Sequence, residues 1–202
     1  MQKKPRIPKQ DRSIATKQQL FQAALELFAE QGYHHTTTKK IAARAGIGVG
    51  SFYAYYKNKK TLFLEVIQYY YQQIQQTAFP GNLDHSAVEE PREFLGTLLR
   101  QLYDAHDISP QLHREITGMR YSDPEVDRLI SAEETKTIGA IRQLIEQLGP
   151  ALSVDDPEAA AYIVHRSAEE VIHSIKIFGS SVESERLLAE LQRMLGRYLC
   201  GP

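Results

Sequence analysis

Apolar residues recur at helical spacing along almost the whole chain, and the strict alternation expected of a β-strand is nearly absent. Spacings of three and four residues bring side chains onto one face of a helix. The first such face combines Leu20, Ala23, Ala24, Leu27 and Phe28. This periodicity predicts an all-α protein with about nine helices.

The segment 36–63 carries the most specific local pattern. Thr37 stands where a helix N-cap is expected, glycines at positions 46 and 48 mark a tight turn, and a further short helix is expected over 49–55 or 49–56. Two short helices joined by such a turn form a helix-turn-helix, whose second helix enters the major groove of DNA. The segment therefore predicts a three-helix, homeodomain-like DNA-binding domain. Its expected core residues are Ile41, Ala42, Ala45, Ile47 and Phe52.

Caps and breaks predict the boundaries of the first and fourth helices. Asp11, Ser13 or Thr16 can cap the start of the first helix, and Gly32 stands where its C-terminal cap is expected. The fourth helix begins near Asn58, and residues 79–82 break the chain after it. Its expected buried residues are Leu62, Phe63, Val66, Ile67, Tyr70 and Ile74.

The second half of the chain predicts a C-terminal helical bundle. Pro91, Pro110, Pro124 and Pro157 each stand near a helix start, where proline is tolerated. The expected helices are 91–106, 110–120, 124–148, 157–178 and 184–199. The fourth and fifth of these have broad apolar faces, which suit either a subunit interface or an ordinary intrachain core.

Charge is distributed unevenly along the chain. Residues 1–60 hold 12 lysines and arginines against three acids, a net charge of +9, whereas residues 61–202 carry −10 and the whole chain −1. A basic head on an acidic body is typical of a protein that meets nucleic acid through one end. A basic N-terminal arm (Lys3, Lys4, Arg6, Lys9 and Arg12) can follow the DNA backbone or enter a minor groove, or it can be a plain disordered tail.

Composition narrows the cellular context. The single cysteine, Cys200, rules out an internal disulfide framework and a Cys-rich zinc site. No apolar run approaches the ~20 residues that span a membrane, and no apolar stretch follows the N-terminal charges as it would in a signal peptide. We therefore expect a cytoplasmic, nucleoid-associated protein without a membrane partner.

The region from Leu20 to Phe63 resembles the DNA-binding domain of the TetR family of bacterial transcriptional repressors. Many fixed positions carry the resemblance over roughly a quarter of the chain. The matching residues are Ala23, Ala24, Leu27, Phe28, Gly32, Thr37, Ile41, Ala42, Ala45, Gly46, Ile47, Gly50, Tyr53, Tyr55, Lys57, Lys59 and Leu62.

This resemblance implies a function and a domain organisation. It implies a DNA-binding domain over 1–60 that includes the basic arm, and a ligand-binding and dimerisation domain over 61–202. The expected protein is a homodimeric repressor that binds a palindromic double-stranded DNA operator and is released by an unknown small effector. The alternative is an architectural, or otherwise not ligand-regulated, DNA-binding protein of the same fold.

Two residues depart from the family pattern. Gly48 stands where the family usually has Ser or Thr, so the helix that follows lacks a side-chain cap. Tyr56 replaces the usual Phe and adds a hydroxyl that needs a partner if it is buried.

Residue chemistry suggests how the head meets DNA. Ser51 can donate a hydrogen bond to a base edge, whereas Val49 and Ala54 can contact a thymine methyl group. Lys39 is the best candidate for a guanine contact. Phosphate contacts, which fix the register without reading the sequence, are expected from Thr38, Tyr53, Tyr55 and Lys59, and from Thr37 through the helix N-terminus that it caps. The full predicted DNA-binding set is Thr37, Thr38, Lys39, Val49, Gly50, Ser51, Tyr53, Ala54, Tyr55 and Lys59.

Two further residue sets are predicted for the C-terminal domain. A pocket for a mainly apolar effector with one or two hydrogen-bonding groups is expected between the helices that start near 91, 110, 124 and 157. Its candidate lining is Tyr70, Leu99, Tyr103, His106, Met119, Tyr121, Ile141, His165 and Glu169. The candidate dimer interface is Val164, Ala168, Val171, Ile175, Phe178, Leu187, Leu191, Met194 and Tyr198.

Other chemical signals are weak. His165, Glu169 and His173 share one helix flank at a spacing that could hold a metal, but Lys176 continues that flank and disfavours a cation, so we expect a polar wall and no metal site. Glycines 46, 48 and 50 lack the preceding strand of a dinucleotide-binding loop. Cys200 lacks a neighbouring base and is therefore a poor candidate for a nucleophile. We expect no catalytic group and no cofactor.

Overall fold

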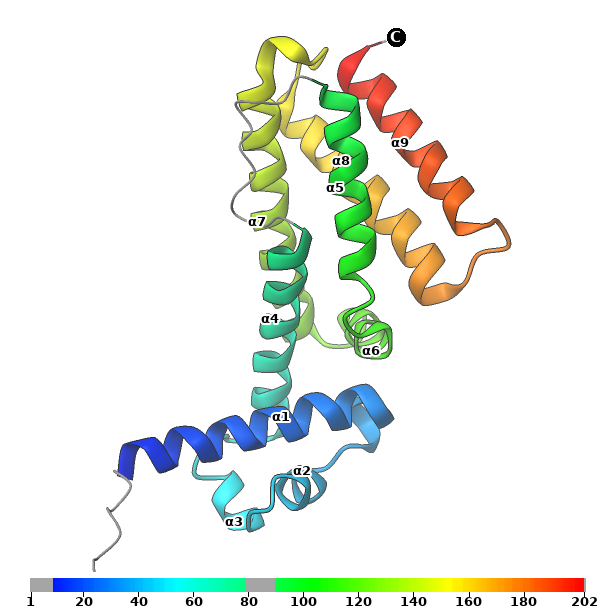
Figure 1. Cartoon of the computed structure of the whole chain (residues 1–202). Coiled ribbons are helices and arrows are strands. Elements are labelled where there is room, and N and C mark those ends of the chain that lie inside the picture. Colours follow the sequence, from blue (N-terminus) through cyan, green and yellow to red (C-terminus); the bar gives the residue numbers. More distant parts are fainter. Residues whose placement is uncertain (1–8, 79–89, 202) are drawn as a thin grey trace, which may run out of the picture. The chain divides into compact units, whose positions relative to one another are not determined.

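The computed structural model describes residues 9–78 and 90–201, with side chains from Ser13 onward, and divides the chain into two compact units between Tyr69 and Tyr70. Within these residues there are nine α-helices and no strand (Figure 1), so the all-α prediction is confirmed. The division falls inside α4 (Lys59–Ala78), whereas the predicted domain boundary after residue 60 lies at the start of that helix. The predicted break over 79–82 and most of the basic arm lie outside the described residues.

Unit 1 consists of α1 (Lys9–His35), α2 (Thr38–Arg44), α3 (Val49–Phe52) and the first half of α4. The apolar face predicted for α1 forms its core, where the rings of Phe28 and Phe63 meet edge to face at 4.9 Å between centroids. Leu20, Ala24 and Phe28 are fully buried. The helical periodicity of the sequence therefore predicted these core residues correctly.

The N-terminal end of α1 differs from the prediction, whereas its C-terminal end agrees with it. The helix already includes Lys9, so the predicted caps at Asp11, Ser13 or Thr16 are wrong and these residues lie inside it. At its C-terminal end, Gly32 breaks the helix with φ 78°, a conformation that favours glycine. The side chain of Thr36 then donates hydrogen bonds to the carbonyls of Gly32, at 2.8 Å, and of Leu27, at 3.2 Å.

The helix after the turn is shorter than predicted. It ends at Phe52 rather than at Tyr55 or Tyr56, and the chain continues in tight turns, with Ala54 N–H donating to Ser51 O and Tyr55 N–H to Phe52 O. These three-residue turns wind more tightly than an α-helix. They return Tyr56 to the core, where it is 2 % exposed beside the buried Phe52. Of the expected core residues, Ala45 and Ile47 are only half-buried.

Unit 2 holds the second half of α4 and five further α-helices, as predicted. Each of the four prolines is the first residue of its helix, and Ser109, Asp123 and Asp156 cap three of these helices with their side chains. The bounds are α5 (Pro91–Ala105), α6 (Pro110–Arg120), α7 (Pro124–Leu148), α8 (Pro157–His173) and α9 (Ser184–Cys200). The predicted helix 157–178 ends as a π-helical turn, η3 (Ser174–Phe178), and a short 3-10 turn, η2 (Gly149–Ala151), follows α7.

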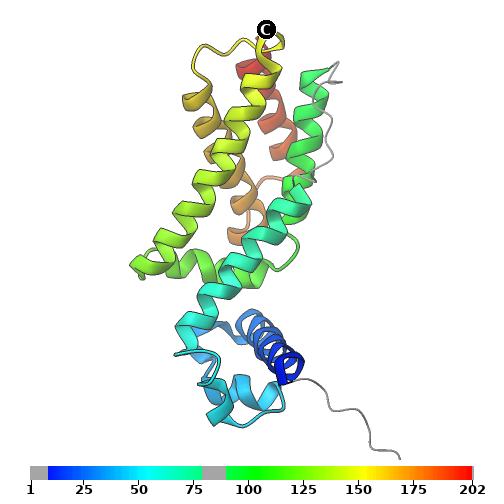
Figure 2. The ribbon, with the colours of Figure 1, turned by 90° about the vertical axis from the view of Figure 1, so that its left-hand side faces the viewer.

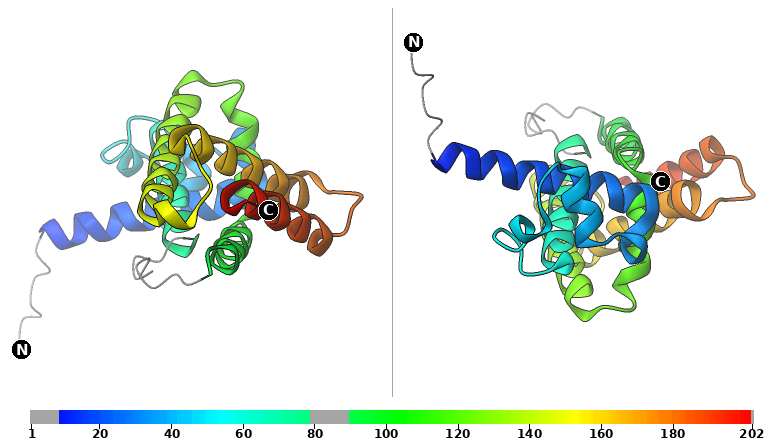
Figure 3. Two further views of the ribbon diagram at one scale, coloured as in Figure 1. Left: turned by 90° about the horizontal axis from the view of Figure 1, so that it is seen from above. Right: turned by 90° about the horizontal axis from the view of Figure 1, so that it is seen from below.

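The helices of unit 2 pack around a core of leucine, isoleucine, valine and alanine. Helix α8 packs against α7 and α9, and α5 packs along α9, as the view from above in Figure 3 also shows. Helix α6 lies crosswise to α7 (Figure 2) and contacts both α7 and η3. Ala160, Ala161 and Ala168 let α8 approach its neighbours closely. No described helix is long and apolar enough to cross a membrane.

Thr36→Val should destabilise unit 1. Valine keeps the shape of threonine but removes the hydroxyl that serves two buried carbonyls, so the free energy of unfolding should fall by about 1–3 kcal/mol. Thr61→Val is the matched control, because its exposed hydroxyl bonds only to Asn58, whose side chain keeps its bond to the Thr61 N–H. Urea titrations of both variants would measure the difference, and equal losses would contradict the assignment.

Candidate functional site

The glycine turn fixes how α2 and α3 meet. Gly46 has φ 70°, and the following Ile47 N–H donates to Ala42 O at 3.0 Å, which closes the C-terminal end of α2. Helix α2 packs against both α1 and α3. The predicted helix-turn-helix is therefore present, with its two short helices held by one turn.

Predicted DNA-binding residues gather at the N-terminal end of α2. Thr37 caps this helix by accepting a hydrogen bond from the Lys40 N–H at 3.2 Å, as predicted. The Thr38 and Tyr53 hydroxyls lie 3.3 Å apart, and the side chain of Lys39, the residue after Thr38, is exposed. Free N–H groups at a helix start, two hydroxyls and an ammonium suit a phosphate and a neighbouring base edge.

Several basic residues of the head bind other parts of unit 1. Arg44 makes a two-pronged contact with Glu30, at 3.0 and 2.8 Å, and a further contact with Glu26, which ties α2 to α1. Lys40 Nζ donates to Gln31 Oε1 at 2.7 Å and to a backbone carbonyl at 2.8 Å. The net charge of residues 1–60 therefore includes basic side chains that are already engaged within unit 1.

Lys59 has a structural role that its position in the sequence does not indicate. Its ammonium donates to Tyr33 O at 2.6 Å and to Thr36 O at 2.8 Å, and lies 3.9 Å from the centre of the Tyr33 ring. Burial lowers the pKa of this lysine. These contacts join the start of α4 to the end of α1, so Lys59 positions the loop before α2.

The start of α3 presents small and apolar groups. Gly48 stands at its N-cap position without a side-chain hydrogen bond, as the departure from the family pattern predicts. Val49, Gly50, Ser51 and Ala54 are exposed, whereas Tyr55 is half-buried. The structure therefore brings the predicted base-reading residues together on an accessible surface.

The second departure is accommodated inside unit 1. The buried Tyr56 hydroxyl donates to Glu65 Oε1 at 3.3 Å, which supplies the partner that this hydroxyl was expected to need. Glu65 also forms an ion pair of 2.9 Å with Lys17 of α1. Tyr56 thus links the turn after α3 to α4 and α1.

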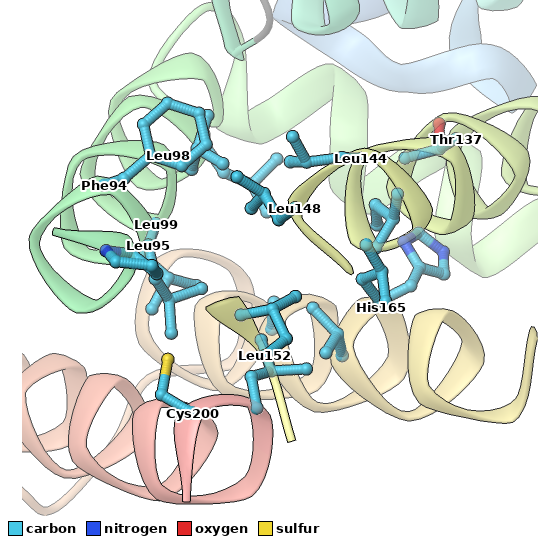
Figure 4. A pocket seen from close by; sticks show the side chains of 17 residues that line it. Phe94, Leu95, Leu98, Leu99, Thr137, Leu144, Leu148, Leu152, His165 and Cys200 are labelled. Carbon is cyan, nitrogen blue, oxygen red and sulfur yellow. The ribbon is translucent and has the colours of Figure 1, made fainter. Parts of the chain in front are cut away.

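Unit 2 contains an apolar cavity between α5, α7, α8 and α9 (Figure 4). It has about 760 Å³ of empty space, including its open mouth, and residues of α5 and α7, many of them leucines, form most of its wall. Thr137, His165 and Cys200 supply polar atoms at its edge. Of these lining residues, Leu99, Ile141 and His165 were predicted from the sequence, whereas Leu95, Leu98 and Leu102 were not, although they share the helical spacing of Leu99 along α5.

A second cavity of unit 2 is polar, with about 870 Å³ of empty space including its opening. Leu102, Thr137 and His165 line both cavities, so the two adjoin each other. In the polar cavity, Glu134 accepts hydrogen bonds from Arg120, at 2.6 Å, and from Arg166, at 3.1 Å.

The polar cavity also holds titratable groups whose pKa values are shifted. Burial, together with the nearby His173 and His106, lowers the pKa of His113 to about 3. Burial also acts to raise the pKa of the Glu169 carboxyl, but contacts with His106 and His173 hold that pKa well below its usual range. This wall therefore combines a neutral imidazole with an ionised carboxylate.

The residues predicted to line an effector pocket divide between these surroundings. Leu99, Ile141 and His165 line the apolar cavity, and His106, Tyr121, His165 and Glu169 line the polar one. The remaining three, Tyr70, Tyr103 and Met119, line neither of these two cavities. Tyr70 instead bonds to His113 at 3.0 Å, and Tyr103 lies beneath the Lys176 ammonium.

The residues predicted for a subunit interface also divide. Val164, Ala168 and Leu191 are buried in the core of unit 2, where they pack against other helices of the same chain. At the surface, Phe178 is 64 %, Met194 51 % and Tyr198 42 % exposed. Val171, Ile175 and Leu187 are half-buried. Ile163 of α8, absent from the prediction, is 45 % exposed.

Two family models match this chain. Residues 20–66 match the bacterial regulatory proteins of the tetR family, and residues 90–199 match the tetracyclin repressor-like C-terminal domain. The second match alone covers more than half of the chain.

Similar proteins are also bacterial transcriptional regulators. The HTH-type transcriptional regulator YhgD of Bacillus subtilis is 26 % identical over 160 residues, which cover 75 % of this chain and 80 % of that protein. The fatty acid metabolism regulator protein of the same bacterium is 40 % identical over 50 residues, only 25 % of this chain and 26 % of its own length. The HTH-type transcriptional repressor SCO4008 of Streptomyces coelicolor is 30 % identical over 132 residues, 63 % of this chain and 64 % of that protein.

Solved structures share the fold at lower identity. A TetR-family transcriptional regulator from Mesorhizobium loti superposes with a TM-score of 0.76 and 21 % identity, covering 92 % of this chain and 96 % of that one. The fatty acid degradation regulator FadR of Bacillus halodurans gives a TM-score of 0.67 and 19 % identity over 95 % of this chain and 96 % of its own.

Proposed function

Because the chain belongs to the TetR family of bacterial transcriptional regulators, we propose that it is a repressor whose dimer binds a palindromic operator and releases it when a mainly apolar effector enters unit 2. Its family and relatives are regulators, so it is a DNA-binding regulator and not an enzyme. The observation that carries the proposal is the apolar cavity of unit 2 in a chain whose other unit is a helix-turn-helix.

The DNA surface is proposed to combine phosphate contacts with a small reading surface. The Thr37 cap and the paired hydroxyls of Thr38 and Tyr53 would hold a phosphate at the start of α2. Lys39 would reach a guanine, and Val49 a thymine methyl group. Lys59 would act indirectly, because two of its three donors already serve backbone carbonyls.

Lys39→Ala should weaken binding to the operator by about 1–3 kcal/mol and affect random DNA less. Lys40→Ala is the matched control, since the neighbouring ammonium binds Gln31 and the His35 carbonyl within unit 1. Operators selected from random DNA would provide the probe for titrations at several salt concentrations. Equal losses on operator and random DNA, with a salt dependence shallower by about one unit, would make Lys39 a phosphate contact instead.

The proposed dimer uses the exposed apolar residues of α8, η3 and α9. Ile163 and Phe178 lie at helical spacing along one side, with Ser167, Glu170 and Ser174 between them. Met194 and Tyr198 are one turn apart on α9, which packs against α8. A two-fold axis would make such a patch self-complementary. The recognition helices of the two copies would then need a separation of about 34 Å to meet successive major grooves.

Light scattering should give twice the 23.0 kDa chain mass. Combining Phe178→Asp with Met194→Asp should yield monomers, because two carboxylates per chain would be buried without partners. Ile108→Asp is the control, since Ile108 is 45 % exposed but lies between α5 and α6. A double variant that remains dimeric would place the interface elsewhere.

The proposed effector site is the apolar cavity, with His165 near the polar end. Aliphatic walls suit an apolar chain or ring, and His165 Nε2 is buried and has no hydrogen-bond partner in the described part of the chain, so it can bind one polar group of the effector. Helix α4 belongs to both units, which makes it the proposed carrier of the response. Release requires that the effector prefer the conformation with low DNA affinity.

Filling the cavity should abolish release without preventing DNA binding. Leu148→Trp places a larger side chain in the wall, whereas Tyr162→Trp changes an exposed residue of α8 outside it. Apolar compounds with one polar end group would be screened by thermal shift and by operator release. Fatty acids belong in the screen, because two similar proteins are regulators of fatty acid metabolism or degradation. A failure of every compound to loosen DNA from the unmodified protein would favour the architectural function.

A further inference from the structure

Three histidines from three different helices meet in the polar cavity of unit 2. His106 follows the last residue of α5, His113 lies in α6 and His173 ends α8. Their ring centroids lie 5.1 Å apart for His106 and His113, 5.4 Å for His106 and His173, and 4.6 Å for His113 and His173. One nitrogen from each ring falls within 4.8 Å of the other two. His106 and His113 are buried, and His173 is half-buried.

Two of the rings are oriented through their Nδ1 atoms. His106 Nδ1 lies 2.8 Å from the Leu102 carbonyl oxygen, and His113 Nδ1 lies 3.0 Å from the Tyr70 hydroxyl. The Nε2 atoms of both rings are buried and have no hydrogen-bond partner among the described residues. Histidines that bind metal ions usually have this arrangement, in which one nitrogen is fixed by an oxygen and the other is left for the ion.

A carboxylate faces the same cluster. Glu169 Oε2 lies 3.0 Å from His173 Nε2 and 3.6 Å from His106 Nε2. The His173 contact does not have the alignment of a hydrogen bond, so this nitrogen too is unsatisfied. This oxygen lies near two of the three rings but is outside the group of nitrogens that fall within 4.8 Å of one another, so it would have to approach the ion to complete a set of four ligands.

The surrounding charges permit a cation. Lys176, which argued against a metal in the sequence, donates both to Asp107 Oδ1 at 2.7 Å and to Asp107 Oδ2 at 2.6 Å. Arg120 and Arg166 both bind Glu134. The wall of the cavity holds these two arginines against the three carboxylates of Glu134, Glu169 and Glu170.

We propose that His106, His113 and His173, with Glu169 as fourth ligand, bind one divalent first-row transition metal ion of the zinc class. Imidazole and carboxylate ligands in a set of four suit Zn²⁺ and disfavour Mg²⁺, which prefers six oxygen ligands. Ligand atoms around a tetrahedral ion with ~2.0 Å bonds lie about 3.3 Å apart, so nitrogens that are now up to 4.8 Å apart would have to move closer together when the ion binds. The ion joins α5, α6 and α8 at a single point.

This site is independent of the apolar effector proposed above. It belongs to the polar cavity, and only Leu102, Thr137 and His165 are shared with the apolar one. None of the four proposed ligands lines the apolar cavity. Metal binding can therefore be present or absent whatever compound releases the operator.

The test uses the untagged full-length chain after removal of metal by a chelator. Zn²⁺ titration by calorimetry should give one ion per chain, and Co²⁺ should give the strong visible absorption of a four-coordinate site with nitrogen and oxygen ligands. His113→Gln and His173→Gln should each lower Zn²⁺ affinity at least about a hundredfold, the upper range for loss of a group that only supports a ligand.

A control variant retains all four proposed ligands. The combination of His34→Gln with His35→Gln removes an exposed pair of histidines in unit 1. This variant should bind Zn²⁺ like the unmodified protein. X-ray absorption of the Zn²⁺-loaded protein should show imidazole scattering from three histidines, a readout that does not depend on the folding of any variant. The proposal would be overturned if Zn²⁺ did not bind, or if removal of the exposed histidine pair alone abolished Zn²⁺ binding.

Discussion

The break of α1 at Gly32 is the constraint on which the helix-turn-helix unit depends. A helix that stops inside a protein leaves backbone carbonyls without partners, and burying them unsatisfied is costly. Two side chains solve this problem together: Thr36 serves Leu27 and Gly32, and Lys59 serves Tyr33 and Thr36 itself. These contacts hold the end of α1, the start of α2 and the start of α4 in one arrangement. The DNA surface that we propose for α2 is built on that junction.

In the described part of unit 2, some polar groups have hydrogen-bond partners and others do not. The helix starts are capped by Ser109, Asp123 and Asp156, as a structural role requires. By contrast, several polar atoms around the two cavities have no hydrogen-bond partner within residues 9–78 and 90–201, including Nε2 of His113 and His165. A buried polar atom without a partner costs stability unless something binds it. The unsatisfied atoms therefore concentrate where we propose an effector and a metal ion.

The net charge of a segment does not show which of its charged side chains are exposed. The head carries a net charge of +9 in the sequence, and this asymmetry indicated a nucleic-acid partner. In the structure Arg44 binds Glu26 and Glu30, and Lys40 and Lys59 bind groups within unit 1. Lys39 and Lys57 remain exposed. Some basic side chains of the head thus stabilise unit 1 through internal contacts, and others are exposed on its surface.

The sequence alone determined the helices, the turn and the family, because these follow from local periodicity, caps and glycine or proline positions. Every proline predicted near a helix start is the first residue of its helix, and Thr37 caps α2. Only the tertiary structure decided which polar groups meet. His106, His113 and His173 are far apart in the sequence, and Leu191 has the same helical pattern whether it faces its own core or another subunit. Periodicity identifies an apolar face, but the neighbour of that face depends on packing between distant helices.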